Sequence, residues 1–236
     1  MKNYVVWTNC EITAGNDREF GMAKPDSGLY NQMFEISRAS ARHYLGGTWT
    51  DIVWSEPAPT RVAMFQQNWQ RIWDLWHSEP CNILYLDSDT VFMRATDIFG
   101  RFEQFRLFNW TTPKSKSPFD NYFNAGVRYY PHTMSTATWQ LGADLAAAWD
   151  LGIWDQEQII FNKMFWSQDL SWEDAHRPEL NWQLPANSDR KQMTKHNGSD
   201  FESAHIIHYH GTRGCDRATR LARELATTAG IHYEIN

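Results

Sequence analysis

Cysteine is scarce in this sequence, and the few cysteines do not form a recognisable pair. The 236 residues contain three, Cys10, Cys81 and Cys215, an odd number at wide spacing. A disulfide framework needs paired cysteines and a thiolate zinc site usually contains a Cys-x-x-Cys pair, so neither is indicated. The scarcity fits a reducing compartment, and we therefore expect a cytoplasmic protein.

Long hydrophobic runs are also missing. No stretch reaches the roughly 18 apolar residues that a membrane-spanning helix requires. The short apolar run that begins at Tyr4 is interrupted by polar residues after Trp7, which is unlike a signal peptide. We therefore expect no transmembrane segment.

The sequence has no excess of basic residues. Lys and Arg number 22 against 28 Asp and Glu, which gives a formal net charge of −6. Bulk nucleic acid and anionic membranes favour basic surfaces, so no nucleic-acid partner is expected. Repeats, low-complexity tracts and linkers rich in Pro, Gly or Ser are absent as well, which predicts a single domain over residues 1–236.

Aromatic side chains are abundant. They make up 15% of the residues, with 13 Trp, 13 Phe and 9 Tyr, and the hydrophobic fraction is 42%, so disorder is excluded. Aromatic residues at this density usually fill a core, and they also line sites for sugars and bases. On the predicted helix that contains Trp69, Trp73 and Trp76, the three rings share one face, which indicates packing.

The first third of the chain alternates between strand and helix patterns, and Thr60 is a suitable N-cap for the second helix. This order selects an α/β layer architecture with ligands at the carboxyl ends of the strands. We predict a Rossmann-like domain with a mixed, mostly parallel central sheet flanked by helices. The predicted strands are Tyr4–Trp7, Asp51–Trp54, Asn82–Leu86, Arg106–Asn109, Phe123–Tyr130 and Ala204–Tyr209; the helices are Leu29–Tyr44, Thr60–His77, Ser135–Leu151, Gln156–Phe165 and Arg217–Ala229; a long loop covers Glu11–Gly28.

Two carboxylates follow the apolar strand that ends at Leu86. In Asp87-Ser88-Asp89 the alternation of side chains lets both acids point the same way at the carboxyl edge of the sheet. Such a pair repels unless a cation lies between the two groups, and oxygen ligands without thiolates favour Mg²⁺ or Mn²⁺. The alternative is that Asp89 caps the following turn and Asp87 is a solvated strand end.

A second polar cluster ends the apolar strand near residue 207. His208 and His210 share a face, whereas His205 points the other way. An imidazole beside two carboxylates shifts the metal preference towards Mn²⁺. A zinc site is the competing interpretation, but the three histidines are split between two faces and have no cysteine partner.

Two further segments carry polar groups suited to a hydroxyl-rich ligand. In Asn124-Ala125-Gly126 the small residues let a ligand approach the backbone, and the amide offers a donor and an acceptor. Asp155-Gln156 lies at a predicted helix start, where Asp155 alone could also serve as an N-cap.

Taken in order, these four segments resemble the retaining glycosyltransferase family 8, which includes glycogenin and bacterial lipopolysaccharide galactosyl- and glucosyltransferases. The family pattern of Asp-x-Asp-Thr, Phe-Asn-x-Gly-Val, Asp-Gln and Ile-Ile-His-Tyr-x-Gly is matched from Asp87 to Gly211. The resemblance implies the GT-A fold and transfer of a hexose from a nucleoside-diphosphate sugar, expected to be a UDP-sugar, to an acceptor hydroxyl with retention. It also implies a nucleotide-binding half over residues 1–110 and an acceptor-binding half over residues 111–236.

Residue by residue, the resemblance implies metal ligands, catalytic residues and a donor site. The implied metal ligands are Asp87, Asp89 and His208, and the metal is Mn²⁺, with Mg²⁺ as the alternative. The implied catalytic residues are Asp155 and Gln156. The donor-binding positions are Thr8, Asn9, Tyr30, Arg71, Ser88, Asn124, Ala125, Gly126, Gly211 and Arg213. Arg213 stands in the region where the family has a diphosphate-binding lysine. Trp154 is the aromatic residue that we expect to form a sugar platform.

Two other classes remain as alternatives. A sugar-nucleotide nucleotidyltransferase would normally have a Gly-rich basic loop after the first strand, whereas the loop Glu11–Gly28 contains only Arg18 and Lys24 as cations and no Gly-x-Gly. A non-catalytic carbohydrate-binding module would use the tryptophans and bind a structural ion through the acids. The acceptor stays open between a glycan, a lipid-linked and a protein acceptor.

Overall fold

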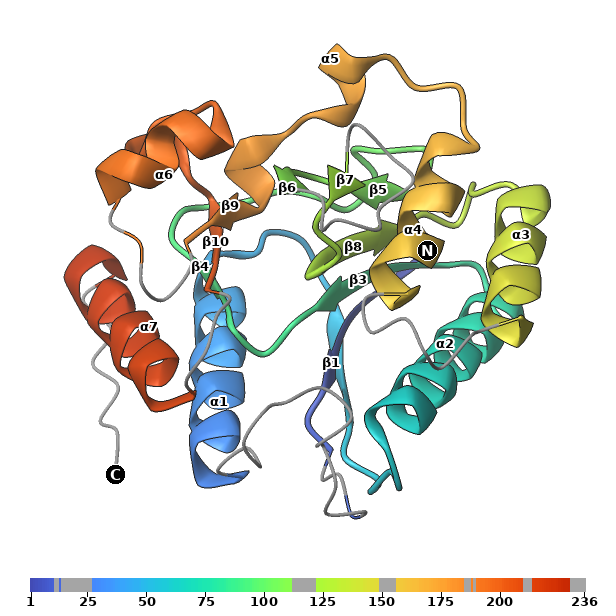
Figure 1. Cartoon of the computed structure of the whole chain (residues 1–236), viewed down its shortest axis with the longest axis horizontal. Helices are drawn as coiled ribbons and strands as arrows, with labels where there is room; N and C mark the ends of the chain where they lie inside the picture. Colours follow the sequence, from blue (N-terminus) through green and yellow to red (C-terminus); the bar gives the residue numbers. More distant parts are fainter. Residues whose placement is uncertain are drawn as a thin grey trace.

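The computed structural model describes residues 1–10, 13, 27–111, 122–148, 156–184, 188, 190–209 and 214–229. Its centre is a five-stranded sheet of order β2-β1-β3-β8-β5 (Figure 1). The strands are β1 (Lys2–Thr8), β2 (Thr50–Trp54), β3 (Cys81–Leu86), β5 (Arg106–Leu107) and β8 (Val127–Tyr130). β1 is parallel to β2 and β3, and β8 is antiparallel to both β3 and β5, so within this sheet β8 runs against the other strands. The prediction of a mixed, mostly parallel sheet is confirmed.

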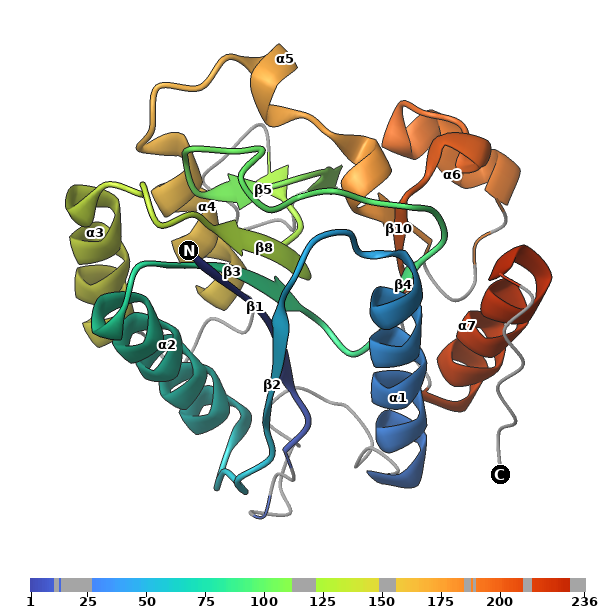
Figure 2. The ribbon, with the colours of Figure 1, turned by 180° about the vertical axis from the view of Figure 1, so that it is seen from behind.

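Helices cover both faces of this sheet, as the two opposite views show (Figures 1 and 2). On one side, α1 (Ser27–Tyr44) lies beside α7 (Gly214–Ala229). On the other side lie α2 (Arg61–Ser78), α3 (Thr136–Ala147) and α4 (Gln156–Trp166). The alternation of side chains along β1 explains the two layers, because Val6 packs in the α2 layer and Val5 packs in the α1 layer.

The predicted strands and helices of the first third are confirmed, with small shifts at their ends. The predicted loop Glu11–Gly28 lies outside the described residues except at Thr13 and at Ser27 and Gly28, which already belong to α1. Thr60 is the N-cap of α2, and its hydroxyl accepts a hydrogen bond from the backbone N–H of Ala63 at 3.1 Å. β3 is buried along its whole length, as its continuous apolar run predicts.

Several of the tryptophans that the structure describes fill the core, as the sequence pattern indicates. Trp139 of α3 is fully buried, and its ring lies 5.4, 5.6 and 5.3 Å from the rings of Trp69, Trp73 and Trp76 of α2. Tyr130 of β8 stacks on it at 5.4 Å. Offset and edge-on ring contacts of this kind add to the free energy of area burial.

The strand predicted over Phe123–Tyr130 is wrong as a continuous element. The chain leaves a two-stranded sheet, β6 (Trp110–Thr111) with β7 (Tyr122–Phe123), and enters the central sheet at β8. The break is at Asn124–Gly126, where the Asn124 N–H donates to Asn109 O at 2.9 Å and the Asp87 N–H donates to Gly126 O at 2.8 Å. These two bonds hold the chain between the sheets. The predicted helix Ser135–Leu151 also ends earlier, at Ala147.

A third sheet, of order β4-β10-β9, contains two strands that the sequence analysis did not predict. β4 (Thr90–Phe92) is antiparallel to β10 (Ile206–His208), and β10 is parallel to β9 (Trp182–Gln183). This pairing places His208 opposite Thr90, one residue after the Asp87-Ser88-Asp89 turn. Among the described residues, the other unpredicted elements are β6, α5 (Trp172–Ala175), α6 (Arg190–Asn197) and the 3-10 turns Pro178–Leu180 and Phe201–Ser203.

None of the helices that the structure describes combines the length and the mean hydropathy that a bilayer-spanning helix needs.

Candidate metal centre and donor edge

Three side chains with metal-binding atoms meet where β3 ends. Asp87 and Asp89 follow β3, and His208 comes from the last position of β10. His208 Nε2 lies 3.1 Å from Asp89 Oδ1 and 3.8 Å from Asp87 Oδ2, and the three ligand atoms all lie within 4.8 Å of one another. A six-coordinate cation with bonds of roughly 2.1 Å separates adjacent ligands by about 3 Å. The arrangement therefore has the size of one side of a cation site.

The burial and charge of the three groups also fit a cation. His208 and Asp89 are buried, whereas Asp87 is half-buried, so the cluster opens towards solvent on one side. Loss of solvent around its carboxylate and the charge of Asp89 raise the pKa of Asp87 to about 6, against the opposing effect of His208. Without a bound cation, negative charges on both Asp87 and Asp89 are unfavourable, because the two carboxylates repel each other. Two carboxylates, an imidazole and no thiolate suit Mn²⁺ or Mg²⁺.

The neighbour of Gly126 is a side chain of this protein, whereas the sequence suggests a bound ligand there. We expected the small residues 125 and 126 to let a ligand approach the backbone. A Cβ added at Gly126 would lie 2.1 Å from Cε1 of His208. The space over the Cα of Gly126 is therefore filled by the imidazole of the candidate metal ligand.

The ends of β1 and β2 form the edge where a nucleotide is expected. The hydroxyl of Thr8 accepts a hydrogen bond from Tyr85 Oη at 3.1 Å. Asn9 donates from its backbone to Trp54 O at 2.9 Å and from its side chain to Asn31 Oδ1 at 2.8 Å. Because β1 lies next to β3, this edge adjoins the Asp87–Asp89 turn.

The other donor positions lie around this edge in different settings. Arg71 of α2 forms an ion pair with Glu56 at 3.1 Å, and its guanidinium lies 5.7 Å from the centre of the Trp54 ring. Trp54 ends β2, so Arg71 lies at the β2 side of this edge. Ser88 is half-buried in the turn between the two acids. Tyr30 lies in α1, but its side chain is outside the described part of the chain.

The other residues named from the sequence lie away from the metal cluster or outside the described part of the chain. Gln156 begins α4, and its side chain is not described. His205 lies away from the metal cluster, with its Nδ1 3.3 Å from the hydroxyl of Thr96. The residues that fall outside the described ranges are Trp154, Asp155, His210, Gly211 and Arg213.

The structure adds residues that the sequence analysis missed. Gln158 Oε1 accepts a hydrogen bond from the Ala125 N–H at 3.2 Å. Arg128 is buried between the rings of Tyr85 and Phe161, at 3.8 and 4.2 Å, and pairs with Glu157 at 2.8 Å. Burial raises the pKa of Asp87, and the charge of Arg128 opposes that rise, as the charge of His208 does. An arginine inside the apolar run 127–130 is the sequence signal that could have identified this group.

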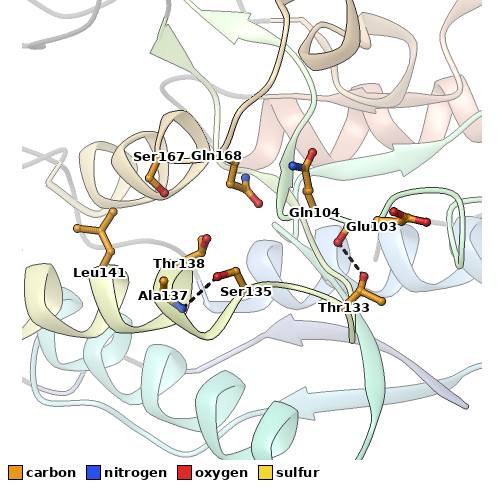
Figure 3. Close-up of a pocket in the computed structure, with 9 residues that line it drawn as sticks. All are labelled: Glu103, Gln104, Thr133, Ser135, Ala137, Thr138, Leu141, Ser167 and Gln168. Atoms are coloured by element: carbon orange, nitrogen blue, oxygen red, sulfur yellow. Dashed lines mark hydrogen bonds between the residues drawn. The ribbon is translucent and has the colours of Figure 1, made fainter.

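A separate cavity of about 330 Å³ lies away from this edge (Figure 3). Its wall includes Thr133 and Ser135, which follow β8, and β8 runs antiparallel to β3. The cavity is therefore at the opposite end of the sheet from the Asp87–Asp89 turn. Two of its polar groups are already paired, because Thr133 Oγ1 donates to Glu103 O at 2.7 Å and Ser135 Oγ accepts from Ala137 N at 3.1 Å.

Comparisons with known proteins find matches in structure only. No protein-family model and no curated protein matches the sequence. A glycosyltransferase involved in the glycosylation of the major capsid of PBCV-1 matches with a TM-score of 0.53 and 13% identity, over 94% of this chain and 98% of that one. The galactosyltransferase LgtC, in complex with donor and acceptor sugar analogues, matches with a TM-score of 0.51 and 10% identity, over 97% of both chains.

A third match is the bifunctional glycosyltransferase WbbM in its apo form. It has a TM-score of 0.55 and 12% identity over 96% of this chain, which spans 50% of that one. At these identities the comparisons establish the fold. The chain has the GT-A type α/β fold of these glycosyltransferase structures, as the sequence resemblance implied.

Proposed function

We propose that this chain is a metal-dependent glycosyltransferase of family 8 type. It would move a hexose from a nucleoside-diphosphate sugar, expected to be a UDP-sugar, to an acceptor hydroxyl with retention of configuration. The observation that carries the proposal is the Asp87, Asp89 and His208 cluster at the carboxyl edge of β3. In α/β folds this edge is where ligands bind.

The metal ligands would be Asp87 and Asp89, through carboxylate oxygens, and His208, through Nε2. When bound, Mn²⁺, with Mg²⁺ as the alternative, would neutralise the negative charge that grows on the leaving diphosphate. Because that charge is larger in the transition state than in the bound donor, holding the ligands in place favours bond cleavage.

We propose separate roles for the remaining donor positions. Thr8, Asn9 and Tyr30 would surround the base, and Arg71, Gly211 and Arg213 would contact the diphosphate. The sugar would lie against Ser88, Asn124 and Ala125, since His208 fills the space over Gly126.

In the reaction, the bond from the anomeric carbon to the phosphate oxygen breaks, and a bond to the acceptor oxygen forms. Asp155 and Gln156 are the groups proposed to lie below the anomeric carbon. The acceptor hydroxyl gives its proton to the phosphate oxygen of the departing nucleoside diphosphate, which leaves with the electron pair of the broken bond. Residues 1–110 would supply the nucleotide side and residues 111–236 the acceptor side, with a glycan, a lipid-linked or a protein acceptor. The scarcity of cysteine supports a cytoplasmic location.

The test is release of nucleoside diphosphate from a panel of nucleotide sugars, with Mn²⁺ and with chelator. We expect slow, metal-dependent hydrolysis by the unmodified chain and its loss in Asp89→Asn. Asp169→Asn, which changes an exposed carboxylate, is the matched control and should retain activity.

Other outcomes would overturn parts of the proposal. Full activity of Asp89→Asn would contradict the metal assignment. Formation of a nucleoside triphosphate that depends on pyrophosphate would identify a nucleotidyltransferase. Binding of sugars without turnover of any donor would indicate a carbohydrate-binding module.

A further inference from the structure

The imidazole of His208 contacts a buried amide on the side that faces away from the carboxylates. Its Nδ1 lies 2.9 Å from Oδ1 of Asn124, while its Nε2 faces Asp89 and Asp87. Both His208 and Asn124 are buried, with exposed fractions of 3% and 9%. A contact of this length in a buried site is a hydrogen bond, so one of the two atoms must donate.

The orientation of the Asn124 amide is fixed by its other partners. The backbone N–H of Gly126 points at the same Asn124 oxygen at 2.9 Å, and Asn181 Nδ2 lies 3.3 Å from it. A backbone N–H can only donate, so the amide atom that faces it must be the oxygen. Rotating the amide by half a turn would set an NH₂ group against the Gly126 N–H.

The protonation of the imidazole follows from this orientation. Because the Asn124 oxygen can only accept, Nδ1 of His208 must carry the hydrogen. Nε2 is then the nitrogen that faces the two carboxylates, in the place where a metal ligand is needed. Histidines that bind metals generally donate their other ring N–H in this way.

Further buried amides hold Asn124 itself in place. The backbone N–H of Asn124 donates to Asn109 O at 2.9 Å, and Asn109 Nδ2 donates to Asn181 O at 3.0 Å and to Asn197 Oδ1 at 2.6 Å. Asn197 in turn exchanges two hydrogen bonds with the backbone of Gln183, at 2.8 and 2.9 Å. The amide that touches His208 is thus fixed through both its backbone and its side chain.

We infer that Asn124 is a positioning residue of the metal centre, whose side-chain oxygen keeps hydrogen on Nδ1 of His208 and directs Nε2 towards the cation. This inference rests on the proposed function, since it concerns the same metal centre. It gives the oxygen of Asn124 a role distinct from the sugar contact that the sequence resemblance implies. The amide nitrogen of the same side chain is not needed for this role.

Two substitutions separate the oxygen of Asn124 from its nitrogen. Asn124→Asp keeps an oxygen for His208, Gly126 and Asn181 but loses the NH₂ group, whereas Asn124→Leu loses both. Asn82→Leu is a matched control, because Asn82 is also buried and hydrogen-bonded but bonds Asn3 and His132 instead of His208.

The first measurement is the Mn²⁺ affinity of each folded variant, determined from the electron paramagnetic resonance signal of Mn²⁺. We expect about 10- to 100-fold weaker binding for Asn124→Leu. Asn82→Leu should remain within about threefold of the unmodified chain, and Asn124→Asp should bind Mn²⁺ at least as tightly, because it keeps the oxygen and adds a negative charge near the cation. Thermal unfolding of each variant shows whether the sample is folded.

The second measurement needs no metal and no donor sugar. In ¹⁵N-histidine-labelled protein without metal, the Nδ1 of His208 should show a directly bonded hydrogen, and the Asn124→Leu variant should lose it or exchange it faster. A bare Nδ1 in the unmodified chain, or unchanged Mn²⁺ affinity in folded Asn124→Leu, would overturn the inference alone. Failure of the unmodified chain to bind Mn²⁺ would overturn the metal site of the proposed function and the inference with it.

Discussion

Replacing Gly126 by alanine should displace His208 from the candidate metal centre. The new Cβ would lie 2.1 Å from Cε1, 2.6 Å from Nδ1 and 2.8 Å from Nε2 of that imidazole. Carbon atoms in contact are about 3.5 Å apart, so the ring would have to retreat by roughly 1.4 Å. Distances from metal to ligand tolerate only about 0.2 Å.

The expected loss of affinity is therefore that of a missing ligand. Disturbing the support of a metal ligand weakens binding by about 10- to 100-fold, and displacing the ligand itself should reach at least the upper figure. A 100-fold loss corresponds to about 2.7 kcal/mol. Isothermal titration of Mn²⁺ into Gly126→Ala measures it directly.

Two other glycines provide controls for this experiment. In Gly46→Ala the nearest atom to the new Cβ is Thr96 O at 3.4 Å, so stability and Mn²⁺ affinity should change little. In Gly142→Ala the new Cβ would lie 2.4 Å from the Trp69 ring, so stability should fall while the folded protein keeps its affinity. Affinity and unfolding temperature of Gly126→Ala equal to those of the unmodified chain would refute the reasoning.

Two further predictions concern the core. Trp139→Ala should lower the free energy of unfolding by about 3–5 kcal/mol, because Trp139 is fully buried. Trp172→Ala, at a position that is 37% exposed, should lower it far less. Equal losses for the two variants in denaturant titrations would contradict the assignment of the tryptophans to packing. Arg128→Leu should cost about 3 kcal/mol by leaving Glu157 without its partner, and adding Glu157→Gln should recover part of that loss in a double-mutant cycle. A cycle with no coupling energy would show that the ion pair does not stabilise the fold.

The elements that the sequence predicted well are those whose signals are local. An uninterrupted apolar run predicts β3, and an N-cap at Thr60 followed by apolar residues on one face predicts α2. Both patterns are complete within about twenty residues. Alternation of such elements was enough to select the α/β class.

The elements that the sequence missed depend on distant partners. β4 has three residues, and it is a strand because β10 pairs with it from the other end of the chain. The polar helix α6 buries Met193 and Asn197 but has no apolar stripe along its length. The break at Asn124–Gly126 also depends on bonds to Asn109 and Asp87, which no local pattern specifies.

The candidate site divides in the same way. Asp87, Asp89 and His208 lie in recognisable motifs, and the structure brings them together. The amides of Asn181 and Asn109, by contrast, lie in segments without a distinctive pattern, and their roles depend on contacts across 57 and 72 residues. Hydrogen-bond geometry between buried amides is set by packing, and periodicity does not record it.

The pairing of β4 with β10 has a consequence for how the chain reaches its native state. The imidazole of His208 and the two carboxylates are joined by contacts between distant parts of the sequence, and such contacts form slowly because a long loop must close first. A chain that has folded only as far as the turn after β3 holds both acids but lacks the nitrogen ligand. High-affinity cation binding would therefore appear only when folding is complete. If Mn²⁺ binding is recorded during refolding, its rate would report when β10 docks onto the rest of the domain.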